Sequence, residues 1–593
     1  MKLLRIKITD PTGFRSLPCG FEHHFRSEEV LEDELAKPED FAPFVCAGPN
    51  GSGKSNLLEA LAAIFFQLEI LRVRRSFLPE VLQNADEDFS PVAFELDYLI
   101  RVPSEYIHPD GPVWAKVSVW KNTGESVRFF WDNQSDFDVS DYEAFEGGHA
   151  DFLMPQYVVG YSSGENEILS LPFFKLRFVQ FDEYWNALTQ QLSYPGYPEI
   201  RLAYLDNGFS QAILLCNLLF QNEATLQPFR EDVGIEGLRE FRIILKRRIE
   251  VSAKQAAQST SNEYISSGYS QDSYFVDNPA ISLSPETGAY TVNLMHLMEG
   301  DERSSIIEKL KRCATLSYQD NTTDTLILDY WVNEATREAF HDNFDGSPLS
   351  LFQAFQVLLV LNLYSVSDSL KADIYRSQSH YVSETVPTLA SDERAMRFKH
   401  VYLKKKGISK PMLLKELSDG EHQLLHSLGL CLLFRNTNSL FLLDEPETHF
   451  NPAWRASFIS RLRDCLQGQA ETSQEMLITT HSPFLISDSK SSKVLVFEKN
   501  PENHAVNINH PNYNTLGASI NKITNETFEK SETIGERARQ ILGDLLRGHL
   551  AEDDPTNLAK KIMDTVGESI ERTLAVHALL HSDQKKNNKE EQD

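Results

Sequence analysis

The stretch that decides the fold is Gly48-Pro49-Asn50-Gly51-Ser52-Gly53-Lys54-Ser55, which fits the phosphate-binding loop pattern G-x-x-x-x-G-K-[ST]. The apolar run 44–47 before it predicts a short buried strand. Residues 57–66 after it, rich in Leu, Ala, Ile and Phe, predict a helix. Glycines let backbone N–H groups close around phosphate oxygens, and the start of a helix adds a dipole that favours an anion. Strand, glycine loop and helix together predict a nucleoside triphosphate site.

Two side chains of this loop have specific expected roles. Lys54 is expected to reach the β- and γ-phosphates of ATP, and the Ser55 hydroxyl is expected to ligate Mg²⁺. The predicted nucleotide-binding positions in this part of the chain are Asn50, Gly51, Ser52, Gly53, Lys54, Ser55 and Asn56.

Length and charge limit the class of protein. The chain has 593 residues, too many for one ordinary core, so two or three domains are expected. Its formal charge is −29, with 86 acidic against 57 basic residues. This balance argues against a general nucleic-acid coat, which relies on Lys and Arg facing phosphates. The local basic clusters at 72–75, 246–248 and 404–406 are expected to be solvated faces.

Cysteines and apolar runs indicate the compartment. The six cysteines are scattered with no C-x-x-C pair, so neither a disulfide framework nor a zinc site is predicted. Residues 3–8 alternate like an amphipathic strand rather than a cleavable signal. The longest apolar runs, such as 57–66, fall short of a membrane span. We therefore expect a soluble, cytoplasmic protein with no membrane contact.

The first half of the chain reads as two parts. Residues 1–200 are expected to form an N-terminal ATPase lobe, which holds the phosphate loop and an antiparallel sheet, because residues 90–133 alternate as strands do. Residues 201–400 are expected to form a mostly helical insertion. Its predicted helices are 212–219, 238–249 and 350–363.

The second half also reads as two parts. Residues 401–525 are expected to form the C-terminal ATPase lobe, because strands and helices alternate there as in a parallel α/β layout. Residues 526–593 are expected to be a helical segment, and the charged tail 584–593 is expected to be disordered.

The stretch Ser439-Leu440-Phe441-Leu442-Leu443-Asp444-Glu445-Pro446-Glu447 is an apolar strand that ends in two acids. Asp444 is placed to hold Mg²⁺ through water at the end of the strand. Glu445 is placed to polarise the water that attacks ATP. Pro446-Glu447 directly afterwards strengthens this interpretation, because an apolar run before acidic residues is common by itself.

A second motif, Leu417-Ser418-Asp419-Gly420-Glu421, precedes these acids, with Gly420 24 residues before Asp444. It resembles the signature motif of ATP-binding-cassette (ABC) proteins, L-S-G-G-E or L-S-D-G-E. A Leu-rich helix predicted from His422 to Phe434 follows it, and a helix start with small residues suits a γ-phosphate. In that family the signature contacts nucleotide on the other subunit. The resemblance implies that Ser418, Gly420 and Glu421 bind ATP in a head-to-tail pair.

A third motif lies 37 residues after Asp444, where Met476-Leu477-Ile478-Thr479-Thr480-His481 is another strand that ends in a polar turn. His481 matches the switch histidine of the ABC family, which senses the γ-phosphate. Residues 448–452 occupy the place of the loop that crosses the dimer interface in that family.

The glutamine that usually helps to ligate Mg²⁺ in the family has two candidates. Gln156 precedes the strand-like run 157–160, and Gln180 lies within another, 178–181. Gln156 is ranked ahead of Gln180. The predicted metal ligands are Ser55, Asp444 and Gln156, and the predicted catalytic residues are Glu445 and His481.

The layout of the motifs indicates the branch of the family. Lys54 and Ser418 are 364 residues apart, so a large insertion splits the ATPase. This layout resembles chromosome-maintenance and repair ATPases and the overcoming-lysogenization-defect nucleases. The long coiled coils of the first group and the toprim nuclease motifs of the second are not seen. The expected fold is α/β: a split ABC-type P-loop head with an added antiparallel sheet, a mostly helical insertion and a helical C-terminal segment.

The remaining resemblance is to AAA-type ATPases of bacterial anti-phage systems, particularly the ATPase subunit of Septu-type and retron-linked systems. It is carried by residues 160–167 (GYSSGENE) and 514–521 (NTLGASIN). The resemblance implies an ATP- and Mg²⁺-dependent homodimer or higher even-numbered oligomer that holds and regulates a separate HNH nuclease. A retron reverse transcriptase and its nucleic acid are further partners that it implies.

Two other functions stay open at this stage. Arg572 and His577 fit the R-x4-H spacing of HEPN ribonucleases, although Arg394 and His400 give a similar spacing by chance. A DNA-repair ATPase is the other alternative, and a basic track across the dimer would distinguish it.

Overall fold

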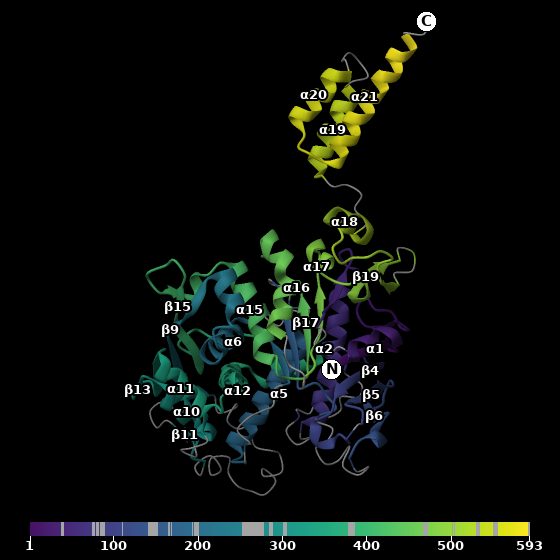
Figure 1. The fold of residues 1–593 in the computed structure, drawn as a ribbon. Helices are drawn as coiled ribbons and strands as arrows, with labels where there is room; N and C mark the ends of the chain where they lie inside the picture. The colour runs from purple at the N-terminus through teal and green to yellow at the C-terminus, as the bar shows by residue number, and fades with distance from the viewer. Residues whose placement is uncertain are drawn as a thin grey trace.

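The structure is a computed structural model of the whole chain, and it shows an α/β body with a helical C-terminal bundle (Figure 1). The residues that it describes are 1–36, 41–73, 78, 82, 89–109, 111–139, 152–163, 167, 169–192, 194, 201–251, 278–283, 289–299, 305–377, 386–466, 472–500, 502, 505–528, 534–548 and 555–590.

A seven-stranded sheet forms the centre of the body, in the order β20-β19-β3-β18-β17-β7-β8. All neighbouring strands are parallel except β20, which pairs antiparallel with β19. Its strands are β3 (Phe44–Ala47), β7 (Tyr157–Ser162), β8 (Leu202–Tyr204), β17 (Ser439–Asp444), β18 (Glu475–Thr479), β19 (Val494–Lys499) and β20 (Val506–Asn509). Strands from both ends of the chain therefore interleave in one sheet, as the split-head prediction requires.

The strands of this sheet are apolar on both faces because two cores cover them. Leu440 and Leu442 of β17 face the first core, and Phe441 and Leu443 face the second. The first core contains α2 (Lys54–Arg72) and α5 (Ser170–Thr189). The helices that the second core contributes against this sheet include α6 (Asn207–Phe220), α15 (Asp419–Phe434), α16 (Pro452–Leu466) and α17 (Pro483–Ser487). Continuous apolar runs are typical of such doubly covered parallel strands.

The predicted antiparallel sheet of the N-terminal lobe is present, in the order β2-β1-β4-β5-β6. It packs over α2 in the first core. Its strands are β1 (Lys2–Ile8), β2 (Glu22–His24), β4 (Phe94–Arg101), β5 (Trp114–Lys121) and β6 (Arg128–Trp131), and α1 (Glu28–Ala36) follows β2.

The insertion contains more strand than the sequence predicts. One sheet has the order β13-β14-β9-β15-β16 and another the order β10-β12-β11. Their strands are β9 (Ile235–Lys246), β10 (Arg248–Val251), β11 (Ile281–Leu283), β12 (Tyr290–Asn293), β13 (Leu316–Asp320), β14 (Thr325–Trp331), β15 (Met396–Lys405) and β16 (Met412–Leu413). The helices in the described part of the insertion are α6, α10 (Ile306–Cys313), α11 (Glu334–Asn343), α12 (Pro348–Val360) and α13 (Asp368–Arg376).

The helix predicted over 238–249 is wrong, because this segment lies in β9 and β10. Phe241, Ile243 and Leu245 are buried at every second position, while the polar residues Glu240, Arg242 and Lys246 around them are only partly buried. That pattern suits a strand buried on one face. The other two predicted helices of the insertion are confirmed as α6 and α12.

One helical stretch, Pro348–Ser365, is long and apolar enough to cross a membrane by length and composition, with a mean hydropathy of 1.3 over 18 residues. It is not an unbroken apolar run of the kind considered from the sequence. Polar residues such as Gln353 and Gln356 interrupt this one. Half of the stretch is buried inside the structure, where α12 packs against α6. A buried core helix of a globular body satisfies the same criteria.

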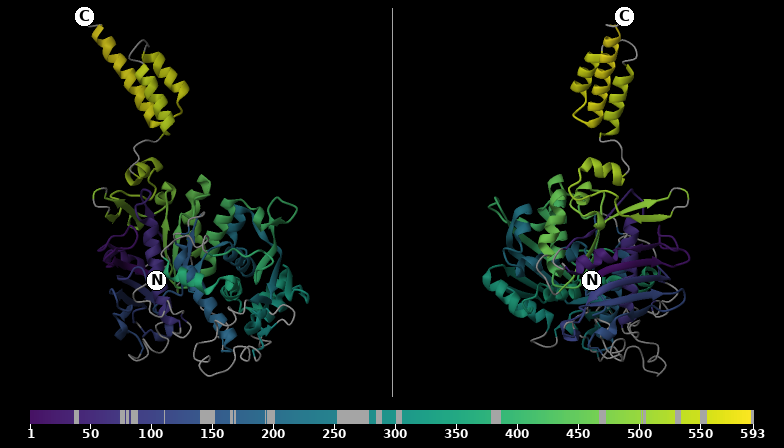
Figure 2. Two further views of the ribbon diagram at one scale, coloured as in Figure 1. Left: turned by 180° about the vertical axis from the view of Figure 1, so that it is seen from behind. Right: turned by 45° about the vertical axis from the view of Figure 1, so that its right-hand side comes forward.

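The C-terminal segment begins with α18 (Ile520–Phe528), which lies on the body. A bundle then projects away from the body in each view (Figures 1 and 2). The bundle is formed by α19 (Glu536–Gly548), α20 (Pro555–Thr565) and α21 (Ile570–Glu590), and it has a small core of its own around Leu558 and Ile562. The tail predicted to be disordered from 584 is helical as far as Glu590.

Candidate functional site

The phosphate loop joins β3 to α2, as the sequence predicts. Gly48, Gly51 and Gly53 all have positive φ, so the loop needs glycine for its turns. A Cβ on Gly48 would lie 2.4 Å from the carbonyl oxygen of Phe497, which excludes any larger residue. Gly53 caps α2 without a side-chain hydrogen bond, so the first N–H groups of the helix are open to an anion.

The polar side chains of the loop are buried in a way that fits a phosphate ligand. Lys54 is 5% exposed, and its ammonium group donates to the carbonyl oxygens of Gly48 at 3.0 Å and Pro49 at 2.9 Å. Burial lowers the pKa of Lys54, although Glu445 and Asp444 oppose this shift. The hydroxyl of Ser52 is also buried and has no partner within the part of the chain that the structure describes. These groups converge where the motif places the phosphates.

Asn56 has a structural role. Its side-chain oxygen accepts a 2.7 Å hydrogen bond from the Ser16 hydroxyl, and its amide group lies 3.4 Å from Glu59. Arg15 in turn pairs with Glu59 at 2.9 Å. The first turn of α2 is thereby tied to the loop that follows β1.

Asp444 is the centre of the polar site. Its Oδ1 accepts hydrogen bonds from the hydroxyls of Ser55 at 2.7 Å and Thr479 at 2.6 Å, and its Oδ2 accepts one from Ser162 at 3.3 Å. Asp444 ends β17, Thr479 ends β18 and Ser162 ends β7, while Ser55 lies in the first turn of α2. All four residues therefore lie at the carboxyl edge of the parallel sheet. Hydroxyl and carboxylate oxygens are the donors that Mg²⁺ prefers. Ser55 and Asp444 therefore fit a magnesium site.

The structure contradicts Gln156 as a metal ligand. It precedes β7, and its side-chain oxygen accepts a 2.8 Å hydrogen bond from the backbone of Asn438, just before β17. Gln156 and Asn438 lie at the amino edge of the sheet. A strand rises about 3.3 Å per residue, so Gln156 is about 20 Å from Ser162 at the carboxyl edge. Gln180 lies about 15 Å along α5 from the start of that helix. The sequence did not identify Ser162 as a neighbour of Asp444, because the expected ligand was a glutamine amide. The available signal was the position of Ser162 at the end of a predicted strand.

Glu445 and His481 meet beside this centre. The imidazole Nε2 of His481 lies 3.4 Å from Oε1 of Glu445. Glu445 has φ 48°, a left-handed conformation that is rare outside glycine, and its N–H donates to the hydroxyl of Thr479 at 3.0 Å. Burial and the neighbouring Asp444 raise the pKa of Glu445, while burial and Lys54 lower the pKa of His481. Both shifts favour the uncharged forms of the two side chains.

Glu447, on the turn after Glu445, is buried. Its Oε1 accepts a hydrogen bond from the hydroxyl of Thr480, and its Oε2 has no partner within the described residues. Burial raises its pKa to about 7. Arg455 holds the same turn by donating to the carbonyl oxygen of Thr448 at 2.8 Å.

The signature segment begins α15. Ser418 is the N-cap, and its N–H and hydroxyl both donate to the Glu421 carboxylate, at 2.8 and 2.9 Å, in a capping box. Gly420 packs against the 448–452 loop, where a Cβ would lie 2.8 Å from the carbonyl oxygen of His449. Asp419 lines a hollow of about 450 Å³ together with Tyr161 and Ser162 of β7. In the sheet, β17 and β18 separate β7 from the P-loop strand β3.

Arg572, the arginine of the R-x4-H pair that suggested a ribonuclease, makes structural contacts within the C-terminal bundle. Arg572 donates to the carbonyl oxygens of Val566 at 3.0 Å and Met563 at 3.3 Å, which end α20. This is the contact of a basic side chain that caps a helix C-terminus.

Comparisons with known proteins agree with an ATPase domain. Residues 332–487, about a quarter of the chain, match the family described as "AAA domain, putative AbiEii toxin, Type IV TA system". The match contains the signature segment, Asp444, Glu445 and His481 but not the phosphate loop. Together with the strand-loop-helix geometry, it supports a nucleotide-binding ATPase domain with a P-loop.

Two further similarities are limited. Protein ea59 of Escherichia phage lambda is 32% identical over 90 residues, which are 15% of this chain and 16% of that protein. The chain therefore spans about a sixth of the length of this curated relative. The solved structure of an SMC head bound to the C-winged helix domain of ScpA overlays 86% of this chain and 98% of its own, with a TM-score of 0.29 and 10% identity. A score at this level does not establish a shared fold.

Proposed function

We propose that this chain is an ATP-binding and ATP-hydrolysing regulatory subunit, in which nucleotide state controls a partner nuclease. The observation that carries the proposal is the contact of Glu445 with His481 beside the Ser55–Asp444 pair. Lys54 and the loop N–H groups bind and orient the phosphates. Glu445 accepts the proton of the attacking water, and His481 holds that carboxylate in place. Mg²⁺ held by Ser55 and Asp444 would neutralise phosphate charge.

Two subunits pair head to tail in this proposal. Ser418 and Gly420 begin α15 beside β7, and two strands, β18 and β17, separate β7 from β3. We propose that the signature of one subunit therefore faces the phosphate loop of its partner. ATP is then bound between Lys54 of one subunit and Ser418 of the other.

A route from the nucleotide to the C-terminal helices supports a regulatory role. The rings of His481 and Phe528 lie 6.3 Å apart between centroids, and Phe528 ends α18 just before the bundle. A shift of His481 on ATP hydrolysis therefore changes the packing of α18. We propose that this movement is transmitted to a separate nuclease of the HNH type within a cytoplasmic anti-phage complex. A retron reverse transcriptase with its nucleic acid is a further proposed member.

Mixing of two variants tests the shared site. Lys54→Ala removes the ammonium group that is proposed to bind the phosphates, and Ser418→Arg blocks the signature surface. Each variant alone is expected to lose ATP turnover. Mixed subunits form a heterodimer in which the intact Lys54 of one faces the intact Ser418 of the other. Turnover should then recover to a quarter to a half of the wild-type rate. No recovery, with both variants folded, contradicts the head-to-tail site.

A pull-down of the protein at its native level tests the partner. Recovery of an HNH nuclease in stoichiometric amount, with release or activation that depends on ATP, is the expected outcome. A stoichiometric DNA-repair nuclease instead would replace the proposed defence role with a repair role.

A further inference from the structure

The outer hairpin of the insertion exposes three large apolar side chains. Leu316 and Tyr318 of β13 are 59% and 58% exposed, and Trp331 of β14 is 61% exposed. Leu316 pairs with Asp329 and Tyr318 with Ile327, so all of these side chains and Trp331 lie on the same face. An apolar patch of this kind in a polar surround is typical of a protein interaction site.

The same hairpin offers a free strand edge. β13 is the first strand of the order β13-β14-β9-β15-β16 and lies at the periphery of the body (Figure 1). Among the described residues its only strand partner is β14, so its other edge presents unpaired N–H and C=O groups. Natural edges are usually protected by Lys, Pro or a bulge. The sequence Leu-Ser-Tyr-Gln-Asp of β13 has none of these.

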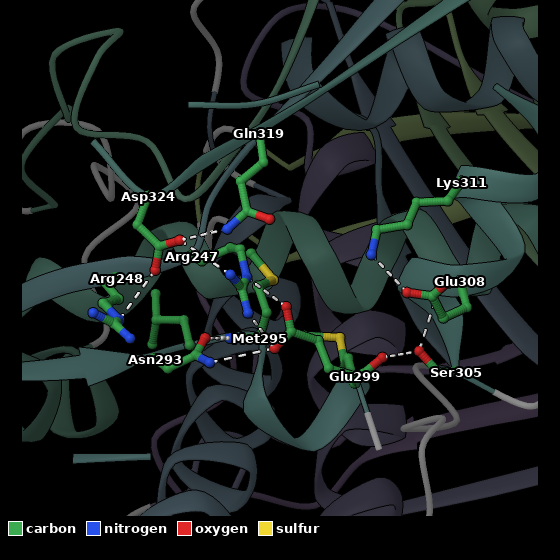
Figure 3. Close-up of polar contacts among 12 residues, drawn as sticks. Arg247, Arg248, Asn293, Met295, Glu299, Ser305, Glu308, Lys311, Gln319 and Asp324 are labelled. Atoms are coloured by element: carbon green, nitrogen blue, oxygen red, sulfur yellow. Dashed lines mark hydrogen bonds and ion pairs between the residues drawn. The ribbon is translucent and has the colours of Figure 1, made fainter. Parts of the chain in front are cut away.

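Ion pairs hold this edge in place. Asp324, in the turn of the hairpin, lies 3.0 Å from Arg247 and 3.1 Å from Arg248, and it accepts a 3.1 Å hydrogen bond from Gln319 (Figure 3). Arg247 also makes a two-pronged pair with Glu299, at 2.6 and 2.8 Å. Arg247 and Arg248 of the basic cluster 246–248 thus fix the hairpin rather than forming a free basic face. A preformed edge costs less conformational entropy on binding.

A hollow of about 470 Å³ adjoins the patch and is lined by Leu316, Trp331, Tyr402 and Glu240, among others. Asp329 in this hollow is neutralised by Arg242, at 2.6 and 2.7 Å. Glu240 is more weakly paired, since its nearest cation among the described residues, Arg239, lies 4.0 Å away. Aromatic walls with one available carboxylate suit the side chain of Lys or Arg.

The surrounding charge also favours a basic ligand. Residues 305–345, which contain the hairpin and its flanking helices, carry eight acidic and four basic side chains, and the whole chain has a charge of −29. We propose that β13 is a docking strand, to which an extended basic segment of a partner protein adds as an antiparallel or parallel neighbour while a Lys or Arg enters the hollow. A segment of five or six residues covers the strand, at 3.3 Å per residue.

This inference rests on the proposed function only for the existence of a protein partner, and its test needs no nucleotide. Random seven-residue peptides displayed on phage are selected against the full chain. The expected consensus alternates apolar residues with Lys or Arg. A synthetic peptide of that consensus should bind with an affinity that falls as salt rises, because charge contributes to the contact.

Two variants and a control locate the site. Trp331→Ala and Tyr318→Lys should each weaken binding of this peptide at least tenfold. Phe130→Lys changes an aromatic residue, 54% exposed, on the edge strand β6 of another sheet, and it should leave binding unchanged. Unaltered melting temperatures show that the variants are folded.

The proposal would be overturned if acidic peptides were selected, or if both variants still bound the peptide as well as the wild type. It would also be overturned if the wild type formed a dimer without nucleotide and Tyr318→Lys dissociated that dimer. Binding of an oligo-dT strand that is lost in Trp331→Ala would assign the face to nucleic acid instead. Failure of the mixed-variant ATPase experiment leaves this test unaffected, so the two proposals fail separately.

Discussion

The hydroxyl of Ser55 donates a 2.7 Å hydrogen bond to Oδ1 of Asp444, a residue 389 positions further along the chain. The contact joins the start of α2 to the end of β17 and thereby closes the two halves of the ATPase on each other. It also lies where the side chains proposed to bind phosphate and to hydrolyse ATP meet.

Replacement of Glu445 by Gln should slow ATP turnover by 10²–10⁴-fold, the range for loss of a general base, while ATP binding persists. In the wild type the pKa of Glu445 is raised, so turnover should fall as pH decreases through a value above 4.5, because the protonated carboxyl cannot accept a proton. Initial rates between pH 4.5 and 8 measure this limb. A Gln variant that retains the wild-type rate would remove Glu445 from the mechanism.

Ser162 and Gln156 form a matched pair for the metal site. Ser162→Ala should raise the Mg²⁺ concentration needed for half-maximal turnover several-fold, because one oxygen beside Asp444 is lost. Gln156→Ala should leave that requirement unchanged but lower the melting temperature, because the backbone N–H of Asn438 loses its partner. Mg²⁺ titrations of both variants decide between them. The reverse result would restore Gln156 as the ligand.

Glu447 should make stability depend on pH. Its folded pKa of about 7 exceeds the usual 4.5, so its contribution is fully present below pH 4.5 and is lost as pH rises through 7. The shift corresponds to roughly 3 kcal/mol. Glu447→Gln should therefore melt higher than the wild type at pH 8 and about equally at pH 5. A difference between the two melting curves that does not change with pH would contradict a protonated Glu447.

Phe528→Ala should uncouple the bundle from the nucleotide. The contact with His481 is lost, while the groups around Asp444 are untouched, so turnover should stay within about twofold of the wild type. Hydrogen exchange of α18 and α19 with and without ATP measures the coupling. The wild type should show an ATP-dependent change that the variant lacks, and Phe528→Leu should retain part of it. An equal change in wild type and Phe528→Ala would exclude this route.

Arg572→Ala should loosen the C-terminal bundle. Two hydrogen bonds from a charged group to the end of α20 are lost, which costs about 1.5–3 kcal/mol in the local stability of the bundle. Limited proteolysis should cut the variant faster between α20 and α21. Ribonuclease activity in the wild type that disappears in a folded Arg572→Lys variant would instead support the HEPN alternative.

The sequence by itself determined the local parts of the site. Gly48, Gly51 and Gly53 identify the phosphate loop because its backbone geometry requires glycine there. The continuous apolar run before Asp444 is by itself typical of a strand that is buried on both faces. The capping box of Ser418 and Glu421 is equally local, since both partners lie within four residues. Such features are readable because the interacting groups are close in the chain.

Only the tertiary structure decided the order of strands in the sheet, and with it the neighbours of Asp444. Ser162 and Thr479 reach that carboxylate because β7, β17 and β18 are adjacent and parallel, whereas Gln156 is at the opposite edge for the same reason. The strand content of the insertion and the free edge of β13 also depend on pairing between distant segments. Pairing is chosen by the burial of whole strands against the cores, and no short stretch of sequence encodes that choice.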